Sequence, residues 1–167
     1  INSESKISDL VLVGTGGSSL GAAALIKTNI NKDPNIAFHI LDSLDPISIS
    51  ELLNRISPKY SKFLIISKSG KTTEIIALVM IIIEWLKNNS IVINKSMMCM
   101  YDHSIAMSSP LANICKEYDL KTSKHRTDIG GRFSVLSATG LLPATIMGID
   151  PNYLRQIARN SLDNSLN

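Results

Sequence analysis

The stretch KFLIISKSGKTTEIIALVM, residues 62–80, contains the transition that decides the fold. Residues 62–67 are mostly apolar and rich in isoleucine, which is typical of a buried strand. After a short run of Ser, Lys and Gly, residues 72–88 have the length and composition of a long, mostly apolar helix. A strand that passes through a short polar loop into a helix is the repeating unit of parallel α/β proteins.

The same strand–helix unit recurs on both sides of this stretch. Further strands are predicted over residues 9–14, 37–42 and 96–102, with a weaker one near 119–122. Further helices are predicted over residues 19–29, 46–56, 108–118 and 134–148, and residues 152–167 also have a helical pattern. Strands at intervals of about 20–30 residues, each followed by a helix, predict a doubly wound α/β fold, with helices on both faces of a parallel sheet.

The composition is that of an ordinary globular protein. The 167 residues are 44% hydrophobic and 19% charged, and the net charge is +3. Lysines and arginines are spread along the chain, so no nucleic-acid partner is indicated. The longest apolar run, residues 75–83, is too short to span a bilayer, and no signal peptide is evident. We therefore expect no membrane partner and a cytoplasmic protein. Because the sequence begins with Ile1 rather than Met, we also expect a piece of a longer protein.

Three segments rich in Gly, Ser and Thr follow predicted strands: GTGGSSLG (14–21), SKSGKTTE (67–74) and TDIGGRFS (127–134). In a parallel sheet the carboxyl ends of the strands share one edge, where such folds bind ligands. Glycines let the backbone approach a ligand, hydroxyls donate hydrogen bonds, and a helix N-terminus favours an anion. The three segments together predict an anion site.

An ATP site is the first alternative for this edge. Gly70, Lys71 and Thr72 match the second half of a P-loop, but that pattern requires a glycine at position 65. Ile65 occupies the position, inside a predicted strand, so the ATP interpretation fails.

A dinucleotide site is the second alternative. Gly14 and Gly16 fit its glycine pattern, and Asp42 after the second strand could hold a ribose, but Ser19 replaces the third glycine. The match is partial, which favours a small phosphorylated ligand held by hydroxyls and amide groups. Lys68 would add charge there, although a solvated loop lysine is the simpler interpretation of that residue. The three histidines, His39, His103 and His125, have no metal-like spacing, so no metal is expected.

The motifs also resemble those of known phosphosugar-binding proteins. The pattern S-x-S-G-x-T-x-E of residues 67–74 resembles the loop of sugar isomerase (SIS) domains. GTGGSSLG, SKSGKTTE and GGRFSVLSATGLLP resemble, in order and spacing, the glucose-6-phosphate isomerase family, although Ser69 and Gly70 are closer to the general SIS loop. The resemblance covers essentially the whole chain. It implies a flavodoxin-like three-layer sandwich and a single SIS domain over residues 1–167, within a longer two-domain enzyme.

Family members interconvert glucose 6-phosphate and fructose 6-phosphate through an enediolate, without metal or coenzyme, in glycolysis and gluconeogenesis. The resemblance implies that the sugar phosphate is held by Gly17, Ser18, Ser67, Lys68, Ser69 and Thr72. It places Gly131 and the catalytic Arg132 beside the reacting carbons.

The resemblance also sets limits on what this segment does alone. The family's glutamate base and its ring-opening His and Lys fall outside this sequence, so the isolated segment is expected to be inactive. A homodimer is implied for the longer protein. The alternative is a non-catalytic SIS module that senses phosphosugars.

Overall fold

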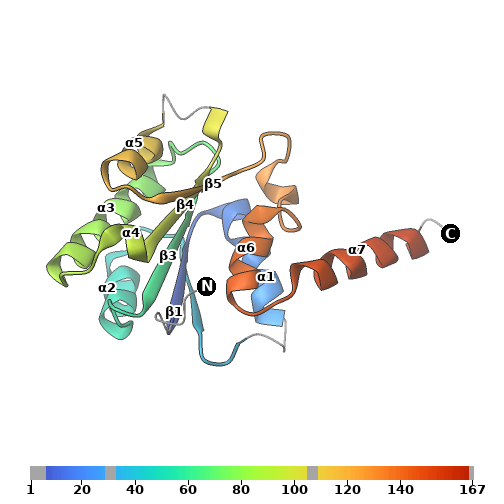
Figure 1. Ribbon diagram of the computed structural model, residues 1–167, viewed down its shortest axis with the longest axis horizontal. Helices are drawn as coiled ribbons and strands as arrows, with labels where there is room; N and C mark the ends of the chain where they lie inside the picture. The colour runs from blue at the N-terminus through green and yellow to red at the C-terminus, as the bar shows by residue number, and fades with distance from the viewer. Residues whose placement is uncertain (1–6, 29–32, 105–108, 166–167) are drawn as a thin grey trace.

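The computed structural model describes residues 7–28, 33–104 and 109–165, which build a five-stranded sheet (Figure 1). Its strands are β1 (Asp9–Val13), β2 (Ala37–Leu41), β3 (Ser61–Ile66), β4 (Met97–Tyr101) and β5 (Lys121–Lys124). Their order is β2-β1-β3-β4-β5, and every neighbouring pair is parallel. This is the strand order of flavodoxin-like doubly wound proteins. The predicted fold class is therefore confirmed.

Helices cover both faces of the sheet, as Figure 1 shows. One face carries α1 (Leu20–Thr28) and α6 (Ala138–Ile146), and the other carries α2 (Pro46–Arg55), α3 (Thr73–Asn88) and α5 (Pro110–Glu117). Successive strand residues alternate between these two cores: Leu10 and Leu12 of β1 face α1 and α6, whereas Val11 and Val13 face the other group. Because both faces are covered, the central strands β1, β3 and β4 are mostly apolar rather than alternating.

Capping residues define where several helices begin. The Asp45 carboxylate accepts a hydrogen bond from the Ser48 N–H (2.9 Å), and Pro46 follows at the first position of α2. Ser109 caps α5 in the same way, with Pro110 in the first turn as predicted. Short elements such as α4 (Ile93–Ser96), which immediately precedes β4, and the 3₁₀ turns η1 (Gly16–Ser18) and η3 (Gly131–Phe133) were not predicted as such.

The predicted bounds of two elements, one helix and one strand, differ clearly from the observed bounds. The helix predicted over 134–148 begins only at Ala138, because Ser137 is its N-cap and accepts a hydrogen bond from the Thr139 N–H (3.3 Å). The weak strand predicted near 119–122 is β5 at 121–124, because Asp119 has a positive φ of 50° and turns the chain after α5. The predicted helix ends at 29, 108 and 167 lie outside the described residues.

The helical pattern near the end of the sequence corresponds to α7 (Pro151–Ser165). This helix projects away from the sheet beyond α6 and contains no buried residue (Figure 1). Among the described residues, no helix has both the length and the apolar composition that crossing a membrane requires.

Candidate functional site

A crevice lies at the topological switch point of the sheet, the place where the winding of the chain changes direction. From β1 the sheet is extended on one side by β2 and on the other by β3, so the loops that follow β1 and β3 diverge at the carboxyl edge. Between them lies a cavity of about 400 Å³. Its lining includes the predicted residues Gly17, Ser18, Ser67, Lys68, Ser69, Thr72 and Gly131. Three loops that are far apart in the sequence thus meet at one site.

The loop after β3 is short and tightly turned. Ser67 is buried, and its N–H donates to the Met100 carbonyl (3.0 Å), which ties the end of β3 to β4. Gly70 has a φ of +60°, and a Cβ atom there would lie 2.0 Å from the Ser109 hydroxyl oxygen. Only glycine fits both conditions. Ile65 is fully buried inside β3, so the strand leaves no room for the longer loop of an ATP site.

The N-terminus of α3 opens onto the cavity. Thr72 is the N-cap residue of this helix, yet its side chain makes no capping hydrogen bond. Its hydroxyl oxygen instead accepts a hydrogen bond from the Ser67 hydroxyl (3.3 Å). The first N–H groups of a helix have no helical acceptors, and they carry a partial positive charge. Hydroxyls and amides around this N-terminus can therefore hold an anion.

The loop after β1 forms the opposite wall. It contains the 3₁₀ turn η1 (Gly16–Ser18), and Ser18 is half-buried at the cavity. Gly17 lies directly against η3: a Cβ atom on Gly17 would be 2.3 Å from the carbonyl carbon of Gly131. The Ser134 hydroxyl donates towards the Gly131 carbonyl (2.7 Å) and lies 3.3 Å from that of Gly17. Two glycine backbones thus pack closely and close this side of the cavity.

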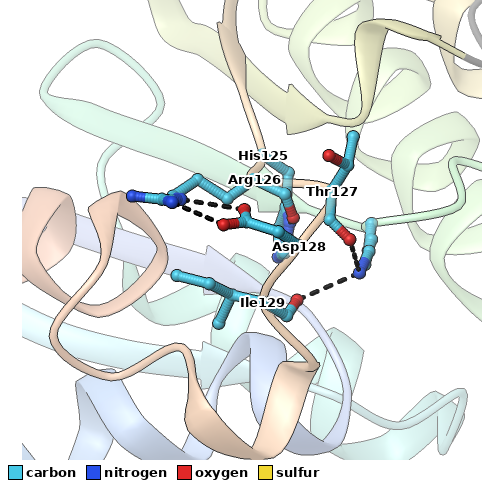
Figure 2. Close-up of polar contacts among 6 residues, drawn as sticks. His125, Arg126, Thr127, Asp128 and Ile129 are labelled. Carbon is cyan, nitrogen blue, oxygen red and sulfur yellow. Dashed lines mark hydrogen bonds and ion pairs between the residues drawn. The ribbon is translucent and has the colours of Figure 1, made fainter.

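Residues 125–130, here called the crossing segment, connect β5 to this wall. The His125 N–H donates to the Tyr101 carbonyl at the end of β4 (2.9 Å). Further along, the Lys68 ammonium donates to the carbonyl oxygens of Thr127 (2.9 Å) and Ile129 (3.0 Å). Dashed lines at the labelled residues Thr127 and Ile129 mark these contacts in Figure 2. The segment therefore passes over the carboxyl ends of β4 and β3 before it reaches Gly131.

An ion pair lies within the crossing segment. The Arg126 guanidinium makes two hydrogen bonds to the Asp128 carboxylate, at 2.9 and 2.5 Å (Figure 2). This contact lowers the pKa of the Asp128 carboxyl to about 2. Both side chains are exposed, so the pair shapes the segment locally.

Asp102 is a cavity residue that sequence reasoning missed. It follows β4 directly, and its carboxylate accepts hydrogen bonds from the hydroxyl (2.7 Å) and the N–H (2.9 Å) of Ser104. These bonds, with the nearby charges of Lys68 and Lys124, hold the pKa of the Asp102 carboxyl below its ordinary value. The signal was present: an acidic residue ends a predicted strand at the edge where the three loops gather.

Arg132 differs from the other predicted residues. It belongs to η3, next to Gly131, but it is exposed and does not line the cavity. Its side chain makes no hydrogen bond or ion pair with any residue that the structure describes. The structure therefore brings seven predicted residues together and leaves Arg132 beside them, outside the cavity.

A second, slightly larger hollow of about 470 Å³ lies elsewhere, beside the edge strand β2 and helix α2. Lys27, His39 and Arg55 are among its lining residues, and none of the three Gly-rich segments reaches it. We assign the functional site to the smaller cavity, because it lies at the switch point and carries the uncapped N-terminus of α3. Within the described ranges, no three His, Cys, Asp or Glu residues gather as a possible metal site.

Comparison with known proteins finds similarity along nearly the whole chain. The family model described as Phosphoglucose isomerase matches residues 2–158. The proteins named glucose-6-phosphate isomerase from Thermus thermophilus and Campylobacter jejuni are 33% and 32% identical to this chain, over 96% and 95% of its length. The chain spans only 38% of the length of each of these relatives.

Solved structures agree with this similarity. A hypothetical protein from Thermus thermophilus superposes with a TM-score of 0.82 at 32% identity, over 96% of this chain and 38% of that one. A glucose-6-phosphate isomerase from Chlamydia trachomatis gives a TM-score of 0.70 at 27% identity, over 81% of this chain and 25% of that one.

Proposed function

Because this chain belongs to the phosphoglucose isomerase family, we propose that it forms the phosphosugar-binding part of an aldose–ketose isomerase. The substrates are glucose 6-phosphate and fructose 6-phosphate, and the setting is cytoplasmic glycolysis and gluconeogenesis. The observation that carries the proposal is the cavity at the switch point, which seven residues of the predicted site line.

The phosphate group binds at the N-terminus of α3 in this proposal. The hydroxyls of Ser67 and Thr72 lie together there, and Ser18 faces them from the loop after β1. Ser69 adds a further hydroxyl, and the close contact of Gly17 with Gly131 keeps the opposite wall near the ligand. A phosphate dianion accepts hydrogen bonds from several such donors at once, and the helix N-terminus favours its charge.

The reaction moves one proton between neighbouring carbons of the open-chain sugar. A base removes the proton from C2 of the aldose, and negative charge develops on the enediolate oxygens. The hydroxyl proton passes from O2 to O1, and the proton taken from C2 returns at C1. We propose that Arg132 stabilises the enediolate, because its planar cation can face two oxygens and it follows Gly131 at the cavity wall. The base belongs to the remainder of the longer protein, which we propose to be a homodimer. No metal or coenzyme takes part in these steps.

Steady-state kinetics of the full-length protein tests this assignment. We expect turnover of fructose 6-phosphate, and we expect Arg132→Lys to lower kcat by about 10²-fold while KM changes far less. Arg155→Lys, on the exposed face of α7, is the matched control and should leave both constants unchanged.

Two outcomes would contradict the proposal at different points. Absence of turnover by the folded wild-type protein would refute the isomerase function. An unchanged kcat in a well-folded Arg132→Lys variant would remove Arg132 from the mechanism but leave the function intact. The 167-residue chain alone should bind fructose 6-phosphate without turning it over.

A further inference from the structure

The crossing segment has no regular secondary structure to hold it in place. It leaves β5 at one edge of the sheet and leads into Gly131, which packs against Gly17 on the far side of β3. The Gly130 carbonyl accepts a hydrogen bond from the Phe133 N–H of η3 (2.9 Å), but the carbonyls of residues 126–129 belong to no strand or helix ladder. They need side chains or water as donors.

Lys68 supplies those donors from the sheet. Its ammonium donates to the carbonyls of Thr127 and Ile129, at 2.9 and 3.0 Å (Figure 2). The backbone from which the side chain starts is itself fixed, because the Lys68 carbonyl accepts a hydrogen bond from the Asp102 N–H (3.0 Å). An ammonium group has three N–H donors, so at most one remains for another acceptor such as a phosphate oxygen.

The other polar contacts of the crossing segment do not replace this link. The Arg126–Asp128 ion pair and the contact of the His125 ring with the Arg126 carbonyl (2.8 Å) both lie within the segment. In the part of the chain that the structure describes, Lys68 makes the only hydrogen bonds that join residues 126–129 to the sheet.

We propose that Lys68 is a positioning residue, which fastens the crossing segment over the carboxyl ends of the strands and thereby holds Gly131 at the cavity wall and Arg132 beside it. Its charge acts mainly on the protein backbone, and the hydroxyls together with the α3 N-terminus hold the anion. This inference deepens the proposed function and rests on it only for the identity of the ligand.

Amide hydrogen exchange of the protein without ligand tests the fastening directly. In Lys68→Met, which keeps the length of the side chain but has no donor, amides of residues 126–133 should exchange about tenfold faster or more. Lys68→Arg restores donors and should bring these rates back close to the wild type. Lys71→Met changes an exposed lysine of the same loop and is the matched control, with wild-type rates expected.

Kinetics of the full-length protein separates positioning from phosphate binding. Lys68→Met should lower kcat for fructose 6-phosphate by about tenfold. The inhibition constant of inorganic phosphate, which needs only the hydroxyls and the helix N-terminus, should change less than about threefold. Lys68→Arg should recover most of kcat.

Unchanged exchange across residues 126–133 in Lys68→Met would overturn the inference, above all if phosphate inhibition weakened more than about tenfold. Amides of β1 and β3 report whether each variant is folded, and Lys68→Leu, which also has no donor, replaces Lys68→Met if that variant is not. Absence of turnover by the wild type would refute the proposed function, whereas the exchange result needs no substrate and would stand independently.

Discussion

At the scale of single residues, two hydroxyl groups dominate the proposed phosphate site. The hydroxyl oxygens of Ser67 and Thr72 lie 3.3 Å apart. Neither side chain caps a helix, so both hydroxyls are available to a ligand. We predict that Ser67→Ala and Thr72→Val each weaken the binding of fructose 6-phosphate by about 1.5–3 kcal/mol, because each removes a donor to a charged oxygen. Titration calorimetry measures this.

Thr73→Val is the control for that experiment, because Thr73 is exposed at the start of α3 and does not line the cavity. The affinity of the Thr73→Val variant for fructose 6-phosphate should equal that of the wild type. If both site variants also bound with wild-type affinity, the phosphate would have to bind elsewhere.

Gly17 tests the close contact between the two backbone walls. A Cβ atom there would be 2.3 Å from the Gly131 carbonyl carbon, so we predict that Gly17→Ala destabilises the protein by about 1–3 kcal/mol and weakens ligand binding. Gly130→Ala is the matched control, since the nearest atom, on Phe133, would be 3.6 Å away. Urea denaturation that gave the same free energy of unfolding for both variants would contradict the packing described for this wall.

The sequence predicts which residues gather at the cavity, but not how they are bonded. Hydroxyls and glycines directly after strands are a local signal, so Ser67 and Thr72 could be found from the sequence. The carbonyl partners of Lys68 and the presence of Asp102 depend on the path of the crossing segment, which is set by tertiary packing. The exposed position of Arg132 has the same cause, and its role remains a prediction.

At the scale of elements, α3 connects the site to the core. Its apolar residues face the sheet at helical spacing, and Ile75, at the cavity, belongs to the same buried stripe as Leu78 and Ile82. This packing fixes the direction in which the helix N-terminus points.

We predict that Leu78→Ala lowers the free energy of unfolding by about 2–5 kcal/mol, because Leu78 is completely buried and the substitution leaves a cavity. Met80→Ala on the same helix is the control: Met80 is 48% exposed, and the expected change is within about 0.5 kcal/mol. Similar losses for the two variants, measured by chemical denaturation, would mean that α3 does not pack as described.

Elements with strong periodicity were predictable, and those set by local turns were not. The helix predicted over 72–88 is α3 at 73–88, whereas the helix predicted over 134–148 begins only at Ala138, after the Ser137 cap. The strand β5 has mostly exposed, polar residues and almost no hydrophobic pattern, so its bounds could not be predicted from the sequence.

At the scale of the whole molecule, strand order decides where the site lies. Alternation of strands and helices predicts a parallel sheet, but which strands are neighbours is not encoded in periodicity. The order β2-β1-β3-β4-β5 places the loops after β1 and β3 side by side, and it brings η3 against η1 although these two turns lie near opposite ends of the sequence. The hollow beside β2 has a slightly larger volume, but none of the three Gly-rich segments lines it.

Backbone amide chemical-shift mapping during titration with fructose 6-phosphate tests whether the crevice between β1 and β3 binds the sugar phosphate. We expect the largest shifts on residues 15–18, 67–74 and 130–132. Shifts concentrated around Lys27, His39 and Arg55, with the loops after β1 and β3 unchanged, would contradict this expectation.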